Sequence, residues 1–292
     1  MADRVVGVIG GSGLYDLDSL EDRDEVRMET PFGAPSDAII TGTLHGVRCA
    51  FLPRHGRGHV LTPSELPFRA NIYAMKALGM SSVVGVSAVG SMKEELRPGD
   101  LVLVDQFIDR TRGRTEESTF FGDGCVGHVH FAAPIWEPLR QLALTAARDV
   151  VDGDAKVHDG GTYLCMEGPA FSTRAESKLY RSWGVDVIGM TNLQEAKLAR
   201  EAELAYSTVA LVTDYDCWHE SEEDVDVAAI LKVLHDNAAR AKRLVERLAE
   251  VVAGADPVSA AGVMEYGVIT AKDKVSGDAR RRLQALIGQY LG

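Results

Sequence analysis

The sequence has no apolar run of about 18 residues, the length that spans a membrane, although 46% of its 292 residues are hydrophobic. We therefore expect no membrane span. A chain of this length is also long enough to bury its own core. Its four cysteines, Cys49, Cys125, Cys165 and Cys217, are far apart and form no CxxC pair, which argues against a zinc site. The opening MADRVVGVIGG lacks a signal-peptide pattern. We expect a cytoplasmic protein with free thiols.

Positive charge is scarce, because 31 Lys and Arg face 43 Asp and Glu, for a net charge of −12. This balance argues against nucleic acid as a partner. An acidic protein that binds an anion must gather positive charge locally, and the stretch PRHGRGH at residues 53–59 is one dense basic cluster.

Two nucleotide-binding motifs are missing. The stretch from Gly11 reads GSGLYD, so Asp16 stands where GxGxxG needs its last glycine, and from Gly10 the third position is Ser12. No GK[ST] occurs either, so the chain carries neither a dinucleotide fingerprint nor a Walker lysine.

A glycine-rich turn follows the first apolar stretch in GVIGGSGLY, residues 7–15. Backbone N–H groups without side chains can surround an anion, and Ser12 adds a hydroxyl. One interpretation is a cradle for a free oxyanion. The alternative is a tight connection between a strand and a helix.

Apolar strands alternate with helical patterns along the chain. Strands are predicted at residues 4–9, 37–54 (two strands joined at 45–46), 81–91, 99–109, 160–171, 185–190 and 204–216. Helices are predicted at residues 62–79 and 135–151, after 173 and 191, from 227 onward, and in an amphipathic tail near 283–290. Residues 111–133 read as a long loop.

The pattern predicts an α/β fold: one domain, a three-layer sandwich around a central mixed, mainly parallel sheet. We expect the main domain at residues 1–253 and a helical C-terminal segment at 254–292 that packs on it or closes the site. Capping boxes at Thr173-x-x-Glu176 and Thr191-x-x-Gln194 open two of the helices.

Polar residues follow several predicted strands, where α/β proteins bind ligands. The residues at these strand ends are Ser12, Arg54 and His55, Ser87 and Ala88, Met190 and Thr191, and Asp214 and Asp216, most of them polar. Hydroxyls, a guanidinium and an imidazole suit an anion, and the carboxylates form a separate pair on one face of their strand.

Each of these residues has a simpler interpretation. Arg54 fits a surface ion pair, and Thr191 fits a plain helix cap. The two aspartates could cap the next helix or hold a cation. His55 and His59 have metal-ligand spacing, but glycines at 56 and 58 disfavour the helix that would align them.

Eight blocks in order carry a resemblance: GVIGGSGLY, TPFGAPSDAI, RHGRGH, RANIYAMKALG, PGDLVLVDQFIDRT, EGPAFSTRAES, DVIGMTN and VTDYDCWH. They span residues 5 to about 250. The sequence resembles the 5′-methylthioadenosine phosphorylase family, within the trimeric purine nucleoside phosphorylases.

The resemblance implies phosphorolysis of methylthioadenosine to adenine and 5-methylthioribose 1-phosphate, with phosphate as co-substrate and neither cofactor nor metal. It places phosphate at Ser12, Arg54, His55, Ser87, Ala88 and Thr191. It places the nucleoside at Phe171, Met190, Asp214, Asp216, His128 and Ile230, with His128 reaching a neighbouring subunit. A homotrimer or homohexamer follows.

The chemistry assigns the catalytic role to Asp214, with Asp216 beside it. Glycosidic cleavage passes through an oxocarbenium-like transition state, and departing adenine is an anion unless it gains a proton. A buried carboxyl near a second carboxylate has a raised pKa and can supply that proton.

The resemblance also indicates the purine. Relatives that cleave 6-oxopurine nucleosides carry asparagine at Asp214 and glutamate at Ser172, so a 6-amino purine is expected. Adenosine, a 5′-halo-5′-deoxyadenosine and a 6-oxopurine nucleoside remain alternative substrates. A nucleoside hydrolase and a non-catalytic adenosine-binding protein are alternatives of other classes. Gly189 departs from the asparagine of some relatives.

Overall fold

The computed structural model describes residues 4–11, 14, 16–219 and 227–291, with the backbone alone for 227–236. The strands are β1 (Val5–Gly10), β2 (Glu21–Val26), β3 (Ile39–Leu44), β4 (Val47–Pro53), β5 (Ser82–Ser91), β6 (Leu101–Leu103), β7 (Gln106–Arg110), β8 (Val157–Asp159), β9 (Thr162–Met166), β10 (Val187–Gly189) and β11 (Ala205–Asp214). The α-helices are α1 (Phe68–Ala77), α2 (Glu137–Val150), α3 (Arg174–Ser182), α4 (Asn192–Glu201), α5 (Val227–Gly254) and α6 (Gly277–Leu291).

The strands form one mixed sheet in the order β2-β3-β4-β1-β5-β10-β9-β7, and β11 joins it through β5 and carries β6 and β8. The central pairings of β1 with β4 and β5, and of β11 with β5, are parallel. The edge pairings of β2, β3 and β4 are antiparallel. The predicted mixed, mainly parallel sheet is confirmed.

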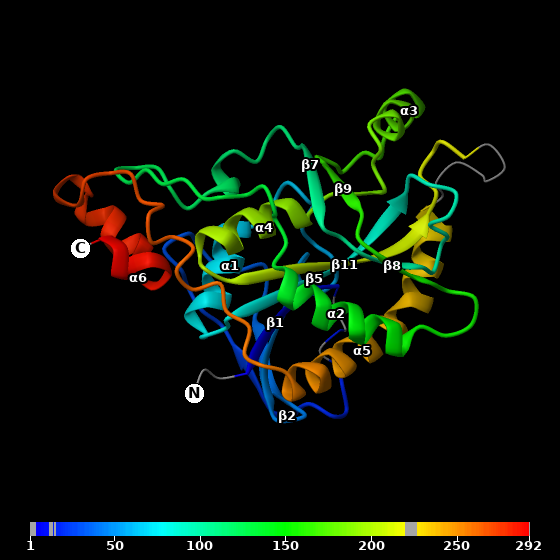
Figure 1. Cartoon of the computed structure of the whole chain (residues 1–292), viewed down its shortest axis with the longest axis horizontal. Helices are drawn as coiled ribbons and strands as arrows, with labels where there is room; N and C mark the ends of the chain where they lie inside the picture. The colour runs from blue at the N-terminus through cyan, green and yellow to red at the C-terminus, as the bar shows by residue number, and fades with distance from the viewer. Residues whose placement is uncertain (1–3, 12–13, 15, 220–226, 292) are drawn as a thin grey trace.

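Helices cover both faces of this sheet (Figure 1). On β1, Val6 and Val8 pack in a cluster with α2 and α5, whereas Val5 and Ile9 pack in a cluster with α1, α4 and α6. Successive strand side chains point to opposite faces, so a strand buried on both faces must be apolar throughout. The three-layer α/β sandwich expected from such strands is therefore confirmed.

Several predicted elements have different bounds. Helix α1 begins at Phe68, six residues after the predicted start, because Pro67 lacks an N–H and disfavours helical geometry at the residue before it. The strand predicted at 99–109 is two strands, since β6 pairs with β11 and β8 whereas β7 pairs with β9. Strands β2 and β8 were not predicted.

Helix α6 packs against α1, and its apolar face lies in the cluster on that side of the sheet. Glu203 anchors this tail, because one of its oxygens accepts hydrogen bonds from the Gly262 and Met264 N–H groups and the Tyr290 hydroxyl, each at 2.8–2.9 Å. Among the described residues, no helix is long and apolar enough to cross a membrane. All four cysteines are free thiols, as expected.

Candidate active site

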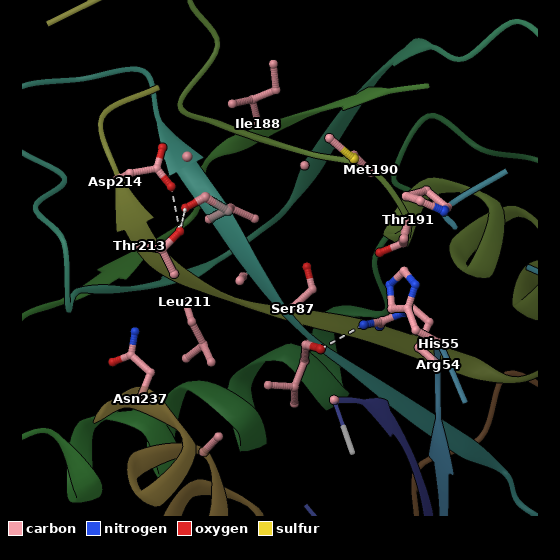
Figure 2. Close-up of a pocket in the computed structure, with 18 of the residues that line it drawn as sticks. Arg54, His55, Ser87, Ile188, Met190, Thr191, Leu211, Thr213, Asp214 and Asn237 are labelled. Carbon is pink, nitrogen blue, oxygen red and sulfur yellow. Dashed lines mark hydrogen bonds between the residues drawn. The ribbon is translucent and has the colours of Figure 1, made fainter. Parts of the chain in front are cut away.

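A cavity of about 610 Å³ lies beside the ends of β1, β4, β10 and β11 and the second half of β5 (Figure 2). The predicted site residues that line it are Arg54, His55, Ser87, Ala88, Phe171, Met190, Thr191, Asp214 and Asp216. Strands β1, β4, β5 and β11 run in parallel. Strand β10 runs antiparallel to β5, and Figure 2 shows the segment after it placing Thr191 on the Ser87 side of the cavity.

The Ser87 and Thr191 hydroxyls lie at one end of the cavity, and the Thr191 hydroxyl donates to Asn192 Oδ1 at a long 3.4 Å. Ser87 Oγ is buried without a hydrogen-bond partner among the described residues, and a buried polar atom without a partner carries a cost that a ligand can remove. Thr191 precedes α4, yet its side chain caps nothing there. Thr191 thus adds a second hydroxyl beside the positive end of a helix, which favours an anion.

The predicted capping box at Thr191 and Gln194 is therefore wrong. The Gln194 amide instead donates to the Thr111 hydroxyl at 3.0 Å. Gln194 thus bonds to Thr111, which is distant in the sequence, instead of to Thr191, and the Thr191 hydroxyl lies at the cavity. The box at Thr173 and Glu176 is confirmed, with both of its hydrogen bonds present.

Arg54 forms a buried ion pair rather than the surface pair considered above. Its Nε lies 2.5 Å from one Glu195 oxygen and an Nη lies 3.1 Å from the other, with the two side chains 3% and 1% exposed. Two further N–H groups donate to the carbonyls of Val86 and Ile9. Of the five guanidinium N–H groups, one is left, so Arg54 can offer a single hydrogen bond to a ligand and not two.

His55 is held in one tautomer. Its Nδ1 lies 2.8 Å from the Leu61 carbonyl, which can only accept, so Nδ1 carries the proton. Burial, with a smaller contribution from the Arg54 charge, lowers the pKa of His55 to about 4. The ring is neutral at pH 7, and its Nε2 accepts a hydrogen bond. An anion bound beside it is best matched if it carries a hydroxyl, as monohydrogen phosphate does.

Two carboxyl groups lie at the opposite end of the cavity. Asp214 ends β11 and accepts from the Thr213 hydroxyl at 2.7 Å and the Asp216 N–H at 2.8 Å. Burial raises the pKa of Asp214 despite these donors. Burial also raises the pKa of Asp216, with a contribution from the Asp214 charge. Either carboxyl can thus hold a proton at a higher pH than an exposed aspartate does.

Arg114 ties the segments that bear Phe171 and Met190 together. It donates to the carbonyls of Met190 and Glu167 and to the Glu167 carboxylate at 3.2 Å. Burial opposes ionisation of Glu167, but the Ser64 hydroxyl, two backbone N–H groups and Arg114 together lower its pKa to about 2. A buried cation thus links the loop after β7 to two walls of the cavity.

Known proteins are similar to this chain in sequence and in structure. The sequence model described as Phosphorylase superfamily matches residues 5–250. The chain belongs to the phosphorylase superfamily. Two relatives named S-methyl-5′-thioadenosine phosphorylase are similar over nearly their whole lengths: one from Gloeobacter violaceus, 56% identical over 98% of this chain and 95% of its own, and one from Geobacter sulfurreducens, 53% identical over 99% and 100%.

Solved structures are similar as well. A methylthioadenosine phosphorylase from an antarctic soil metagenomic library superposes with a TM-score of 0.92 at 46% identity, over 98% of this chain and 100% of that one. The Schistosoma mansoni methylthioadenosine phosphorylase, solved with adenine, superposes with a TM-score of 0.80 at 37% identity, over 86% and 92%. This superfamily member therefore shares their fold.

Two predicted site residues of this phosphorylase-superfamily chain lie outside the described residues, and a third does not line the cavity. Ser12 lies outside the described residues, and so does the side chain of Ile230. His128 is exposed and does not line the cavity, and its N–H donates to the Gly267 carbonyl. His128 therefore lies at the surface, and its contact with another subunit stays a prediction.

Other residues at the site were missed by the sequence analysis. Thr213, which holds Asp214, was detectable as the polar residue next to it at the strand end. Glu195 is in the interior of α4 and 141 residues from Arg54, and Arg114 is in a polar loop. No local signal marks either as a partner of the site.

Proposed function

We propose that the chain catalyses the phosphorolysis of S-methyl-5′-thioadenosine, giving adenine and 5-methylthioribose 1-phosphate. The observation that carries this is one cavity with the Ser87 and Thr191 hydroxyls at one end and a buried carboxyl of raised pKa at the other, and Ser87 Oγ has no hydrogen-bond partner among the described residues. The names of the similar proteins support the same activity.

At the hydroxyl end, phosphate is the nucleophile. Ser87, Thr191 and the remaining Arg54 N–H donate to its oxygens, while the neutral His55 ring accepts from its hydroxyl. We also assign Ala88 and Ser12 to this end, on the resemblance. A phosphate oxygen forms a bond to the anomeric carbon as the glycosidic bond breaks, and the electron pair of that bond leaves with the purine. The anion beside the sugar stabilises the oxocarbenium-like transition state.

At the carboxyl end, Asp214 gives its proton to the imidazole nitrogen of the departing base. General acid help of this kind is typically worth about 10²–10⁴ in rate. Burial keeps the pKa of Asp214 raised, and Asp216 lies beside it as a second carboxyl. Phe171 borders the base and Met190 the ribose, and both line the same cavity. Phosphate is a co-substrate, and the scheme uses no cofactor or metal.

The decisive experiment measures adenine release from S-methyl-5′-thioadenosine by the full chain, with and without phosphate. We expect release only with phosphate, with the sugar recovered as its 1-phosphate. Release at the same rate without phosphate would make the chain a hydrolase. Binding without turnover would make it a non-catalytic adenosine-binding protein.

Adenosine is the second candidate substrate. Similar structures from Schistosoma mansoni are named adenosine/methylthioadenosine phosphorylase, and the aspartate pair would accept from the amino group of adenine, the base of both nucleosides. The two nucleosides differ only in the 5′ group, a hydroxyl against a methylthio group, and an apolar pocket rejects a small hydroxyl-bearing substituent only weakly. Comparing kcat/KM for the two nucleosides under one phosphate concentration ranks them.

We also propose a homo-oligomer, a trimer or a hexamer, in the cytoplasm. Support for the oligomer comes from Val126, Tyr266 and Ile269, large apolar residues that are at least half exposed near His128. The Ile269 N–H donates to the Val126 carbonyl, so Val126 and Ile269 lie side by side, and exposed apolar patches mark interaction sites. Light scattering of the purified chain measures the subunit number. Free thiols fit a reducing compartment.

A further inference from the structure

Tyr163 does not line the cavity, but its hydroxyl lies next to Thr191, at the end of the cavity that holds the Ser87 and Thr191 hydroxyls. Tyr163 belongs to β9, which lies between β10 and β7. The side chain is fully buried, and its ring packs against Phe107 with centroids 5.3 Å apart. The hydroxyl accepts the Thr191 N–H at a long 3.4 Å. Tyr163 thus reaches from the interior of the sheet to the residue that opens α4.

Gly189 leaves room for this hydroxyl. A β-carbon on Gly189 would fall 2.6 Å from Cζ of Tyr163 and closer still to its hydroxyl oxygen. Real β-carbons do not approach other atoms so closely, and Gly189 has no left-handed backbone that would itself call for glycine. The glycine is required by close approach. This explains why the chain has glycine at position 189 where some relatives have asparagine, because Tyr163 occupies the space that a side chain there would need.

The Tyr163 hydroxyl is also a neighbour of Ser87. The two hydroxyls are near enough to interact, and Ser87 Oγ makes no other hydrogen bond among the described residues. Because Tyr163 accepts from Thr191, its own O–H proton is left to donate. A hydroxyl that turns to donate to a ligand can accept a proton from behind, and hydrogen bonds in such a chain strengthen one another.

We propose that Tyr163 is a positioning residue for the attacking anion. This rests on the function proposed above. When phosphate binds, the Ser87 hydroxyl donates to a phosphate oxygen and accepts from the Tyr163 hydroxyl, which in turn accepts from the Thr191 N–H. The chain orients Ser87 and supports Thr191 from the interior, on the side away from the nucleoside. The absence of a side chain at Gly189 leaves the space that Tyr163 needs to reach this position.

The test is Tyr163→Phe, measured as separate KM values for phosphate and for nucleoside. Losing one hydrogen bond of ordinary strength should raise the KM for phosphate about two- to thirteenfold. The KM for nucleoside at saturating phosphate should stay within about twofold. Tyr180→Phe is the matched control, because it removes a hydroxyl from another buried tyrosine that does not line the cavity and should change neither value.

Two further measurements separate positioning from a general loss of structure. In a Ser87→Ala background, Tyr163→Phe should have little further effect, because the intermediate group is gone. Gly189→Ala should be harmful with Tyr163 present and much less harmful with Tyr163→Leu. The phosphate-dependent rise in melting temperature reports anion binding without turnover, and it should shrink in Tyr163→Phe.

The outcomes distinguish the two proposals. If the unaltered chain releases adenine without phosphate or not at all, the proposed function fails. If the unaltered chain is a phosphorylase and Tyr163→Phe changes both KM values equally, or neither, the role of Tyr163 is refuted. Equal effects of Tyr163→Phe with and without the Ser87 hydroxyl would also refute it.

Discussion

Replacing Glu195 with glutamine tests the support beneath the anion end of the cavity. Glutamine keeps the size of the side chain but removes its charge, so Arg54 is left as a buried guanidinium without a counter-charge. Glu195 also accepts the Tyr206 hydroxyl at 2.7 Å, a bond that the glutamine carbonyl can keep. The glutamine NH2 would then face the Arg54 Nε–H, so the change removes the charge and one hydrogen bond while it keeps the size of the side chain.

The expected cost is large because both partners are buried. Breaking a buried pair by removing one partner typically costs about 3–5 kcal/mol. For a domain of this size each kcal/mol lowers the melting temperature by about 2–4 °C. We expect Glu195→Gln to melt roughly 6–20 °C below the unaltered chain. Its KM for phosphate should also change, since Arg54 would no longer be held in place.

Urea unfolding and calorimetry measure this loss. Lys197→Gln is the matched control on the same helix, because Lys197 pairs with Asp109 in a partly exposed bridge, and such pairs are worth about 0–1 kcal/mol. A loss for Glu195→Gln no larger than that of the control would refute the reasoning. The double change of Arg54 and Glu195 to methionine should cost less than the single changes added together, since no charge stays unpaired.

The remaining predictions concern protons. Because Asp214 acts as an acid of raised pKa, kcat should fall as pH rises through that pKa. The Asp214→Asn variant should lose this fall in kcat and should shift the preference toward 6-oxopurines. An unchanged rate of this variant on methylthioadenosine would remove Asp214 from the mechanism. The His55 ring should titrate near pH 4 by NMR, and titration near pH 6.5 would show that it is not buried as described. The lowered pKa of Glu167 contributes stability above the unfolded pKa that is lost as pH falls toward 2. Glu167→Gln should therefore be less stable at pH 7 and lose less between about pH 5 and pH 2, and parallel acid-unfolding curves would contradict this.

Local signals predicted much of the fold. The turn at His45 and Gly46 is present, with both residues at positive φ, and Gly79 follows the end of α1 in the same conformation. These features depend on a residue and its immediate neighbours, which the sequence displays. Strand β2 was missed because its residues, EDRDEV, are charged and mostly exposed. It forms a strand by pairing with β3 at the sheet edge, and no hydrophobic periodicity in its sequence indicates this pairing.

By itself, the sequence determined the α/β class, the buried strands and the polar residues at their ends, since apolar periodicity and local caps act over a few residues. Only the tertiary structure decided which groups are available to a ligand. It engaged Arg54 with Glu195, freed Thr191 from its cap, fixed the tautomer of His55 and brought Tyr163 beneath Gly189. Burial and partners far along the chain set these states, because desolvation and hydrogen bonding depend on what surrounds a group in space.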